Sequence, residues 1–212
     1  MAYGKFITFE GGEGAGKTTQ MAHLARRLEN AGVDVRQTRE PGGSPRAEQI
    51  REVLLKGVGK SLGSMAETLL FFAAREDHLE KTIRPFLRAG GWVISDRFTD
   101  STRAYQGAVG GVSEEVLDYL EDIIVGSTRP YYTIILDIPA KEGLARAAAR
   151  RQKDEVPDRF EAMDIDFHNK LRQAFLKIAT KEPERCVVIN ANATEAHVAD
   201  EIWKSVKQRF SI

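Results

Sequence analysis

The stretch that decides the fold lies close to the N-terminus and reads Phe9-Glu10-Gly11-Gly12-Glu13-Gly14-Ala15-Gly16-Lys17-Thr18-Thr19. It matches the pattern G-x-x-x-x-G-K-[ST], in which glycines let the backbone curl until successive N–H groups point at an anion. A short apolar run precedes the stretch and a segment of helical periodicity follows it, which is the context that the pattern needs. These features predict a loop that binds a nucleoside triphosphate, with an ordinary strand-to-helix turn as the alternative.

The side chains of this loop have chemical roles in that interpretation. Lys17 brings a positive charge to the outer phosphates and is a candidate catalytic residue, while the hydroxyl of Thr18 can ligate Mg²⁺. The helix that opens at about Lys17 turns the positive end of its dipole toward the same phosphates. A dinucleotide site is excluded, because its pattern would need glycine where Lys17 stands. The residues assigned to the triphosphate are Gly11, Gly12, Glu13, Gly14, Ala15, Gly16, Lys17, Thr18 and Thr19.

The length and composition suit one α/β domain spanning residues 1–212, with a small inserted lid. The 31 basic residues balance the 31 acidic ones, which argues against a nucleic-acid partner. The single cysteine, Cys186, excludes a disulfide framework, and we expect it inside a buried strand. No signal peptide is recognisable, and no apolar run approaches the roughly 20 residues that span a bilayer. We therefore expect a cytoplasmic protein with no membrane partner.

Five strand candidates alternate with helical segments along the chain, and they cover residues 5–10, 33–39, 92–95, 131–137 and 185–190. Strands that alternate with helices predict a doubly wound parallel sheet of five strands with helices on both faces, as in P-loop NTPases. Ligands of such sheets bind at the carboxyl ends of the strands. Every candidate site residue below follows such an end or lies on the next helix.

Several helix boundaries also carry sequence signals. An S-x-x-E capping box predicts a long helix over residues 64–88, and Ser113 and Thr194 are predicted to cap two later helices. Residues 98–108 are predicted to be helical. Residues 152–157 are polar without periodicity and are predicted to form a mobile loop.

Two strands end in an acidic residue that could serve the metal. Asp96 and Asp137 each follow an apolar run. We favour Asp96 as the partner of Thr18, because Arg97 follows it directly and can clamp phosphate oxygens as a catalytic residue. A local salt bridge is the alternative for Asp96 and Arg97, and a structural role is the alternative for Asp137.

One face of the predicted long helix carries an aromatic ring beside a guanidinium. Phe71 and Arg75 are four residues apart and therefore share this face. Together they could stack on a flat base and donate to its exocyclic oxygen. Spacing alone favours a core position for Phe71. Phe72 is expected in the core, in line with Leu69, Leu79 and Ile83.

Further polar groups follow the second and third strands. A guanidinium and a carboxylate buried beside a phosphate site, such as Arg39 and Glu40, would need a ligand or each other. Pro41 follows them, and Arg51 lies on the next helix. Beyond Asp96, a polar helical face offers groups suited to sugar and base recognition, namely Ser101, Thr102, Tyr105 and Gln106.

A basic run over Arg146, Arg150 and Arg151 has two interpretations. It is either a solvated charged face, or a lid that brings a catalytic arginine to the transferred phosphoryl group. The phosphate loop has no arginine of its own, so the lid is a sensible source for one.

In this order and at these spacings, the motifs resemble the thymidylate kinase family over the whole chain. The motifs that carry the resemblance are Phe9–Thr19, Thr38–Gly43, Leu70–Arg75, Asp96–Phe98, Ser101–Thr102, Ala104–Gly107 and Asp158–Glu161. The resemblance implies ATP as donor, dTMP as acceptor, Mg²⁺ as cofactor and a homodimer. It also implies the family form whose catalytic arginine comes from the lid, here about residues 146–161. The lid looks longer than in other members, and we favour Arg150 as the catalytic arginine, with Arg151 and Arg146 behind it.

The resemblance further implies a role for each site residue. Glu13 would face the deoxyribose, Phe71 would stack on thymine, and Arg75 would bond its exocyclic oxygen. Arg97 would bridge the donor and acceptor phosphates. The remaining acceptor contacts would be Arg39, Glu40, Pro41, Arg51, Ser101, Thr102, Tyr105 and Gln106.

The implied reaction is ATP + dTMP → ADP + dTDP, which needs positioning and charge neutralisation rather than a strong base. A P-loop kinase for another nucleoside monophosphate or small acceptor is the main alternative. A GTP-dependent switch would need N-K-x-D, but Asn169-Lys170 is followed by Leu171-Arg172.

Overall fold

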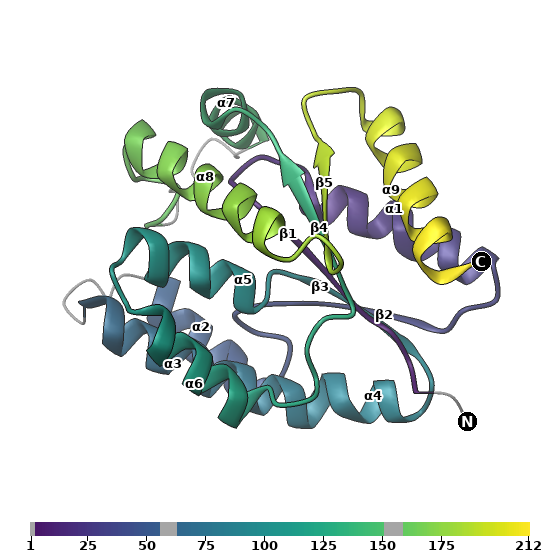
Figure 1. The fold of residues 1–212 in the computed structure, drawn as a ribbon, viewed down its shortest axis with the longest axis horizontal. Helices are drawn as coiled ribbons and strands as arrows, with labels where there is room; N and C mark the ends of the chain where they lie inside the picture. The colour runs from purple at the N-terminus through teal and green to yellow at the C-terminus, as the bar shows by residue number, and fades with distance from the viewer. Residues whose placement is uncertain (1–2, 56–62, 151–158) are drawn as a thin grey trace.

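The computed structural model describes residues 3–55, 63–150 and 159–212. Five parallel strands form one sheet, as the sequence predicts, and the structure shows their order to be β2-β3-β1-β4-β5 (Figure 1). The strands are β1 Phe6–Gly11, β2 Val35–Arg39, β3 Trp92–Asp96, β4 Tyr132–Asp137 and β5 Cys186–Asn190. Every residue of β1 is buried, and so is β4 except Asp137. Burial on both faces explains why these two strands read as continuous apolar runs.

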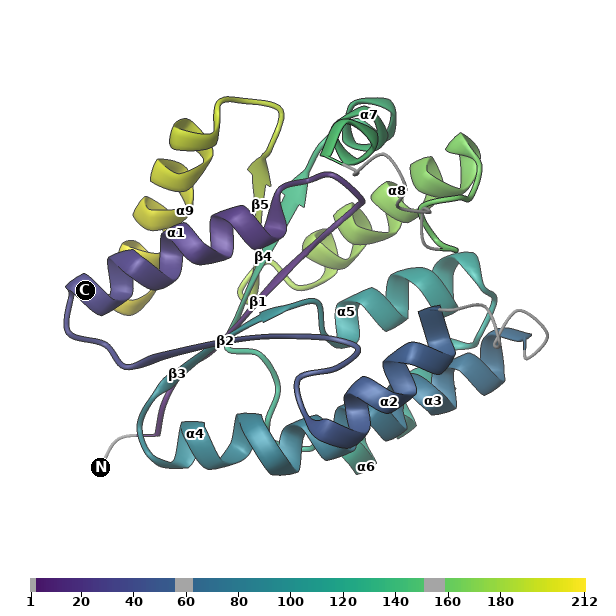
Figure 2. The same ribbon diagram turned by 180° about the vertical axis from the view of Figure 1, so that it is seen from behind.

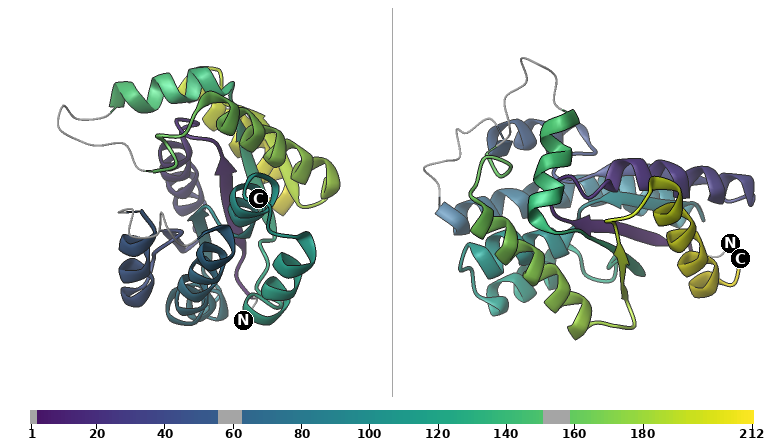
Figure 3. Two further views of the ribbon diagram at one scale, coloured as in Figure 1. Left: turned by 90° about the vertical axis from the view of Figure 1, so that its left-hand side faces the viewer. Right: turned by 90° about the horizontal axis from the view of Figure 1, so that it is seen from above.

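Helices cover both faces of the sheet. They are α1 Lys17–Asn30, α2 Pro45–Leu55, α3 Gly63–His78, α4 Arg84–Arg88, α5 Thr99–Thr102, α6 Glu114–Ile124, α7 Ala140–Arg150, α8 Ile165–Lys181 and α9 Glu195–Phe210. On one face α1 and α9 pack on the strands and on each other, and on the other face α4, α5 and α8 pack on the strands (Figure 2). Figure 3 shows the purple α1 and the green α8 on opposite sides of β1. The sequence therefore predicted the layers correctly.

The loop after β1 is placed beside the end of β3 by strand pairing. Phe9 lies opposite Asp96 in the parallel register, so both segments leave the sheet at the same edge. Gly14 of the loop has φ +68°, and a Cβ there would lie 1.8 Å from the carbonyl oxygen of Gly143 in α7. Only glycine fits so close an approach, so the loop packs tightly between the sheet and α7.

The two longer predicted helices on the α3 side of the sheet each contain a π-helical segment. The helix predicted over residues 64–88 continues from α3 through η2 (Leu79–Ile83) into α4, where Pro85 lacks the N–H that a regular turn would use. The helix predicted over residues 98–108 is α5 followed by η3 (Arg103–Val109). A 3.6-residue pattern does not encode the extra residue of a π-turn, and such turns often occur at functional sites.

The capping box is a wrong prediction. The helix begins at Gly63, so Ser64 lies inside it and its carbonyl accepts from the Thr68 hydroxyl. Glu67 pairs with Arg159 at 2.5 Å instead of reaching back to the helix start. The other two caps are confirmed, because the side chains of Ser113 and Thr194 each accept a backbone N–H of the following helix.

The predicted core stripe of α3 is only partly correct. Phe72, Leu79 and Ile83 are buried in one cluster, but Leu69 is 52% exposed. The helix buries Thr68 and Phe72 on either side of Leu69 in the sequence, so Leu69 lies just outside the buried face.

Candidate active site

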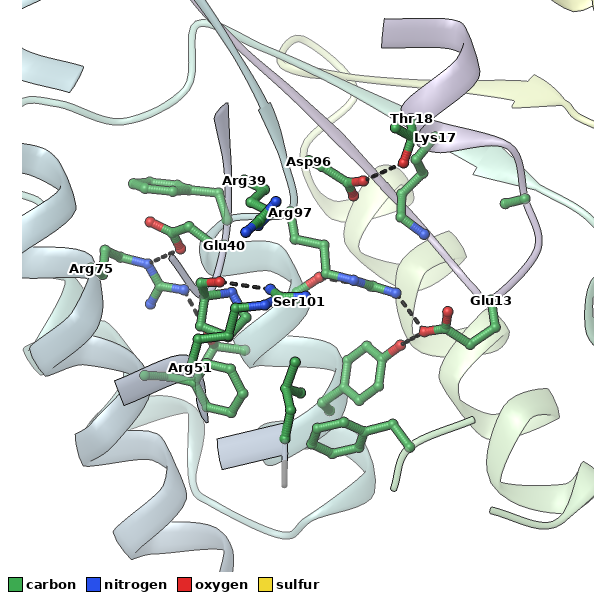
Figure 4. Close-up of a pocket in the computed structure, with 18 of the residues that line it drawn as sticks. Glu13, Lys17, Thr18, Arg39, Glu40, Arg51, Arg75, Asp96, Arg97 and Ser101 are labelled. Atoms are coloured by element: carbon green, nitrogen blue, oxygen red, sulfur yellow. Dashed lines mark hydrogen bonds and ion pairs between the residues drawn. The ribbon is translucent and has the colours of Figure 1, made fainter. Parts of the chain in front are cut away.

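A cavity of about 220 Å³ opens at the carboxyl edge of the sheet (Figure 4). The loop after β1 contributes Gly14, Ala15 and Gly16, whereas Gly11, Gly12 and Thr19 do not line the cavity. The structure brings together the predicted catalytic, metal and acceptor residues Glu13, Lys17, Thr18, Arg39, Glu40, Pro41, Arg51, Phe71, Arg75, Asp96, Arg97, Ser101, Thr102, Tyr105, Gln106 and Arg150.

The phosphate loop holds its own lysine in place. Lys17 Nζ donates to the carbonyl oxygens of Gly11 at 3.2 Å and Gly12 at 2.9 Å. Burial, together with the neighbouring Arg97 guanidinium, lowers the pKa of Lys17. Gly11 and Gly12 therefore shape the site through the lysine, without lining the cavity themselves.

Thr18 and Asp96, the predicted metal pair, are in contact. The Thr18 hydroxyl donates to Asp96 Oδ2 at 3.1 Å, while Asp96 Oδ1 is buried without a hydrogen-bond partner among the described residues. Mg²⁺ binds oxygen atoms and usually takes only one or two of them from the protein. A buried carboxylate oxygen without a partner, beside a hydroxyl group, fits this requirement. Asp137, the other strand-end acid, is held by two bonds from Arg172 at 2.7 and 2.8 Å.

Arg97 lies across the middle of the cavity. Its Nη1 donates to the Gly11 carbonyl at 3.2 Å and to Ser101 Oγ at 3.1 Å, and its Nη2 donates to Glu13 Oε1 at 2.7 Å. Its ion pair is thus with Glu13 rather than with Asp96. Its φ is 69°, a left-handed conformation that costs a non-glycine residue roughly 1–3 kcal/mol and tends to persist at functional sites.

Glu13 is an anion between two donors. Its Oε1 also accepts from the Tyr105 hydroxyl at 3.0 Å. Burial alone would raise the pKa of Glu13, but Arg97 and Lys17 outweigh it and lower this pKa to about 2. The carboxylate is therefore charged at neutral pH and orients Arg97 and Tyr105 around the cavity.

Glu10 supports Arg97 from below, and the sequence analysis did not select it. Its Oε1 accepts the Phe98 N–H at 2.7 Å and its Oε2 accepts from the Ser101 hydroxyl at 2.6 Å, so it holds the chain on the C-terminal side of Arg97. Burial, and then the nearby Asp100, raise the pKa of Glu10 to about 8. An acidic residue near the end of a buried apolar strand was the signal that could have found it.

The raised pKa of Glu10 gives a pH-dependent stability. Because the folded pKa of about 8 exceeds the ordinary 4.5, the stability linked to this group is fully present below pH 4.5 and is lost as the pH rises to about 8. This loss lowers the free energy of unfolding by at most about 1.4 kcal/mol per pH unit. Glutamine stays neutral at every pH, so we expect Glu10→Gln to remove this dependence of stability on pH. Urea unfolding of both proteins between about pH 5 and about pH 9 measures it. Parallel curves would show that Glu10 does not bind the extra proton.

Arg75 is the most deeply buried polar side chain of the acceptor end. It is 1% exposed, and its Nε donates to Glu40 Oε2 at 2.8 Å while its Nη2 donates to Thr102 Oγ1 at 3.0 Å. Its Nη1 is buried without a hydrogen-bond partner among the described residues. Phe71 lies in the cavity wall, whereas Phe72 is in the core. The arrangement leaves one guanidinium nitrogen free for a ligand beside an aromatic ring.

The pairing left open for Glu40 is resolved by Arg75. The sequence offered Arg39 as its partner, but Arg39 pairs with Glu48 at 3.1 Å. Arg51 Nη1 donates to the carbonyl oxygen of Pro41 at 2.7 Å, and the Glu40–Pro41 peptide is cis. Glu40 lines the cavity with both carboxylate oxygens already engaged by the protein, so it acts through its neighbours.

The basic run divides into residues with different surroundings. Arg150 lines the cavity, while Arg146 donates to the Ala191 carbonyl at 2.9 Å. Arg151 and the loop predicted over residues 152–157 lie outside the described residues.

Three apolar residues of the cavity wall were missed as site residues, namely Leu55, Phe98 and Phe160. Phe160 packs edge-on against Tyr105, with ring centroids 5.1 Å apart. No local sequence pattern identifies them, because an apolar residue in a cavity wall has the same spacing as an apolar residue in the core. Phe98 and Phe160 belong to motifs that carry the family resemblance, but the resemblance implies no role for either.

None of the helices in the described ranges is long and apolar enough to cross a membrane. Nor does that part of the chain gather three or more histidine, cysteine, aspartate or glutamate residues able to hold a metal ion.

A parallel α/β sheet with a lysine-bearing phosphate loop, an acid at the neighbouring strand end and an adjoining acceptor cavity defines a P-loop phosphotransferase. The chain matches the family "Thymidylate kinase" over residues 9–202. It is 58% identical over 208 residues to "Thymidylate kinase" of Rhodopseudomonas palustris (strain ATCC BAA-98 / CGA009), covering 98% of this chain and 90% of that protein. It is 55% identical over 207 residues to "Thymidylate kinase" of Bradyrhizobium sp. (strain ORS 278), covering 98% and 91%.

The solved structures agree with the sequence relatives. The crystal structure of thymidylate kinase from Ehrlichia chaffeensis superposes with a TM-score of 0.77 at 36% identity, covering 97% of this chain and 99% of that one. The chain belongs to the thymidylate kinase family. Its reaction is the phosphorylation of dTMP to dTDP, with ATP as the donor that the family implies. The family assignment of the sequence analysis is therefore confirmed.

Proposed function

We propose that the chain transfers the terminal phosphoryl group of Mg·ATP to dTMP in the cavity beside the phosphate loop. The observation that carries the proposal is the free, buried Nη1 of Arg75 next to Phe71. Leaving a buried donor unsatisfied costs about 1–3 kcal/mol, so an acceptor on the ligand would stabilise the site. An exocyclic oxygen of thymine supplies that acceptor, and the Phe71 ring supplies a surface for stacking.

The donor end would hold ATP through the backbone of the phosphate loop, with Lys17 on the outer phosphates. Thr18 and the free Oδ1 of Asp96 would hold Mg²⁺. When bound, the ion offsets charge on the phosphate oxygens.

At the acceptor end, Glu13 would face the deoxyribose and Tyr105 would occupy the place of a ribose 2′-hydroxyl. Their mutual hydrogen bond supports this arrangement, because it fixes both groups against the same part of the cavity. Thr102 and Gln106 would reach the base, and the remaining contacts would come from Arg39, Glu40, Pro41, Arg51 and Ser101.

Arg97 and a lid arginine would neutralise the moving phosphoryl group. Arg97 lies within reach of both loop and acceptor residues, and Arg150 is the lid arginine that we favour, since it lines the cavity. Residues 1–212 would form one kinase domain, with about residues 146–161 as its lid. The acceptor oxygen is ionised, so positioning and electrostatics carry the reaction.

We also propose a homodimer. Large apolar side chains are exposed on the neighbouring helices α3 and α6, namely Met65, Leu69, Tyr119 and Ile123. Packed against a second copy of the chain, these side chains would be removed from water, which supports the proposal.

The test is a panel of nucleoside monophosphates in an ADP-release assay with ATP, with Mg²⁺ and with a chelator. We expect turnover with dTMP, weaker turnover with dUMP, and loss of activity on chelation, because the phosphate charge is then left uncompensated. Turnover without any monophosphate would mean ATP hydrolysis only. No turnover of dTMP at any Mg²⁺ concentration would sink the proposal.

A further inference from the structure

Arg75 is aimed by a chain of buried contacts that begins outside the cavity. Glu40 accepts from Arg75 Nε through one carboxylate oxygen, and its other oxygen lies 3.0 Å from His78 Nδ1. Glu40 is 6% exposed and His78 is fully buried. Because a carboxylate only accepts, His78 Nδ1 must carry the proton of this bond.

The far side of the His78 ring is fixed to the sheet. Its Nε2 lies 2.7 Å from the hydroxyl of Thr38 in β2. A Cβ on Gly43 would lie 2.3 Å from that nitrogen and 2.4 Å from Thr38 Oγ1, so the loop after β2 closes directly over this contact. His78 therefore ties α3 to the strand and loop that carry Glu40.

The guanidinium of Arg75 is consequently clamped at two of its three nitrogens, by Glu40 and by Thr102, and Nη1 has no hydrogen-bond partner within the described part of the chain. A planar fork held at two positions has a fixed direction for the third. Rotation of the Glu40 carboxylate would turn the whole fork, and the bond from His78 opposes that rotation.

We propose that His78 is a positioning residue for base selection, which sets the direction of Arg75 Nη1 by holding Glu40. The inference rests on the proposed function. It assigns His78 no contact with substrate, and His78 is not among the residues that line the cavity. A buried histidine with only a structural role would change stability and all substrates alike.

The test uses two variants that each keep one side of the imidazole. His78→Asn places an amide donor near the Nδ1 position and retains the contact with Glu40, whereas His78→Gln reaches the Nε2 position and loses it. The preference for dTMP over dCMP is measured as the ratio of their kcat/KM values, because dCMP carries an amino group where Arg75 would donate.

We expect His78→Gln to lower kcat/KM for dTMP about 10-fold, to narrow the dTMP/dCMP preference by a similar factor and to leave KM for ATP unchanged. His78→Asn should stay within about twofold of the parent protein. Equal losses for both nucleotides, or equal behaviour of the two variants, would overturn the proposal. If His78→Gln does not fold, Thr38→Val should narrow the preference about two- to threefold, and an unchanged ratio there overturns it.

Thr82→Val is the matched control. The Thr82 hydroxyl donates to the Gly43 carbonyl at 2.7 Å, so it anchors the same loop without touching Glu40. It should lower the melting temperature and keep the dTMP/dCMP ratio, and a narrowed ratio would attribute the effect to loop anchoring in general. Failure of the proposed function is distinct, because the parent protein would then show no preference for dTMP.

Discussion

Replacing Arg97 with alanine should lower kcat by on the order of 10²-fold or more, with little change in KM for ATP or dTMP. The guanidinium contacts the phosphate loop, Ser101 and Glu13 at once, which would place its charge between the two nucleotides of the proposed reaction. Charge on the equatorial oxygens grows as the phosphoryl group moves, so an arginine there stabilises the transition state more than the bound substrates.

Two controls separate this role from stability. Alanine keeps the unfavourable φ of 69°, so Arg97→Ala changes the side chain without relieving the backbone. Arg129→Ala removes an arginine whose side chain is 53% exposed and which pairs with the exposed Asp122, and it should turn over normally. Steady-state kinetics at saturating substrates measure both variants. Near-normal turnover of Arg97→Ala would reject a catalytic role.

Replacing Arg75 with methionine should destabilise the fold by about 3–5 kcal/mol and raise KM for dTMP without raising KM for ATP. The side chains of Arg75 and Glu40 are 1% and 4% exposed, so the change leaves a buried carboxylate without its cation. The loss of Nη1 removes the guanidinium nitrogen that has no hydrogen-bond partner among residues 3–55, 63–150 and 159–212. Urea unfolding and dTMP kinetics report the two effects separately.

The double variant Glu40→Gln/Arg75→Met distinguishes the two contributions. It removes the unpaired charge together with the guanidinium, so most of the lost stability should return. KM for dTMP should stay raised, because the double variant still lacks the guanidinium that would donate to the base. Recovery of dTMP kinetics along with stability would show that Arg75 acts through the fold alone.

The sequence predicts the sheet and the phosphate loop because both depend on local patterns. The glycines, Lys17 and Thr18 are consecutive, and strand ends such as Asp96 are marked by apolar runs. The spacing of Phe71 alone favoured a core position, because helix periodicity does not distinguish a cavity wall from the interior. Only the family resemblance indicated that Phe71 contacts the ligand.

Contacts between segments that are far apart in the sequence could not be predicted from it. Glu40 pairs with Arg75, 35 positions away, rather than with its neighbour Arg39. Glu67 resembled a capping residue, but its partner is Arg159, 92 positions further along the chain. The π-turns in η2 and η3 add one residue to a helical repeat, a change that no pattern of apolar residues records.

The left-handed backbone at position 97 bears on attempts to engineer this enzyme. Glycine adopts such a conformation without a steric penalty, but it would remove the guanidinium that donates to Glu13, to Ser101 and to the Gly11 carbonyl. The roughly 1–3 kcal/mol of backbone strain that glycine relieves is offset by the cost of leaving the part-buried Glu13 carboxylate without its cation. A screen for heat resistance alone therefore has little to gain from glycine at this position, because the contacts of the arginine offset the strain of its backbone.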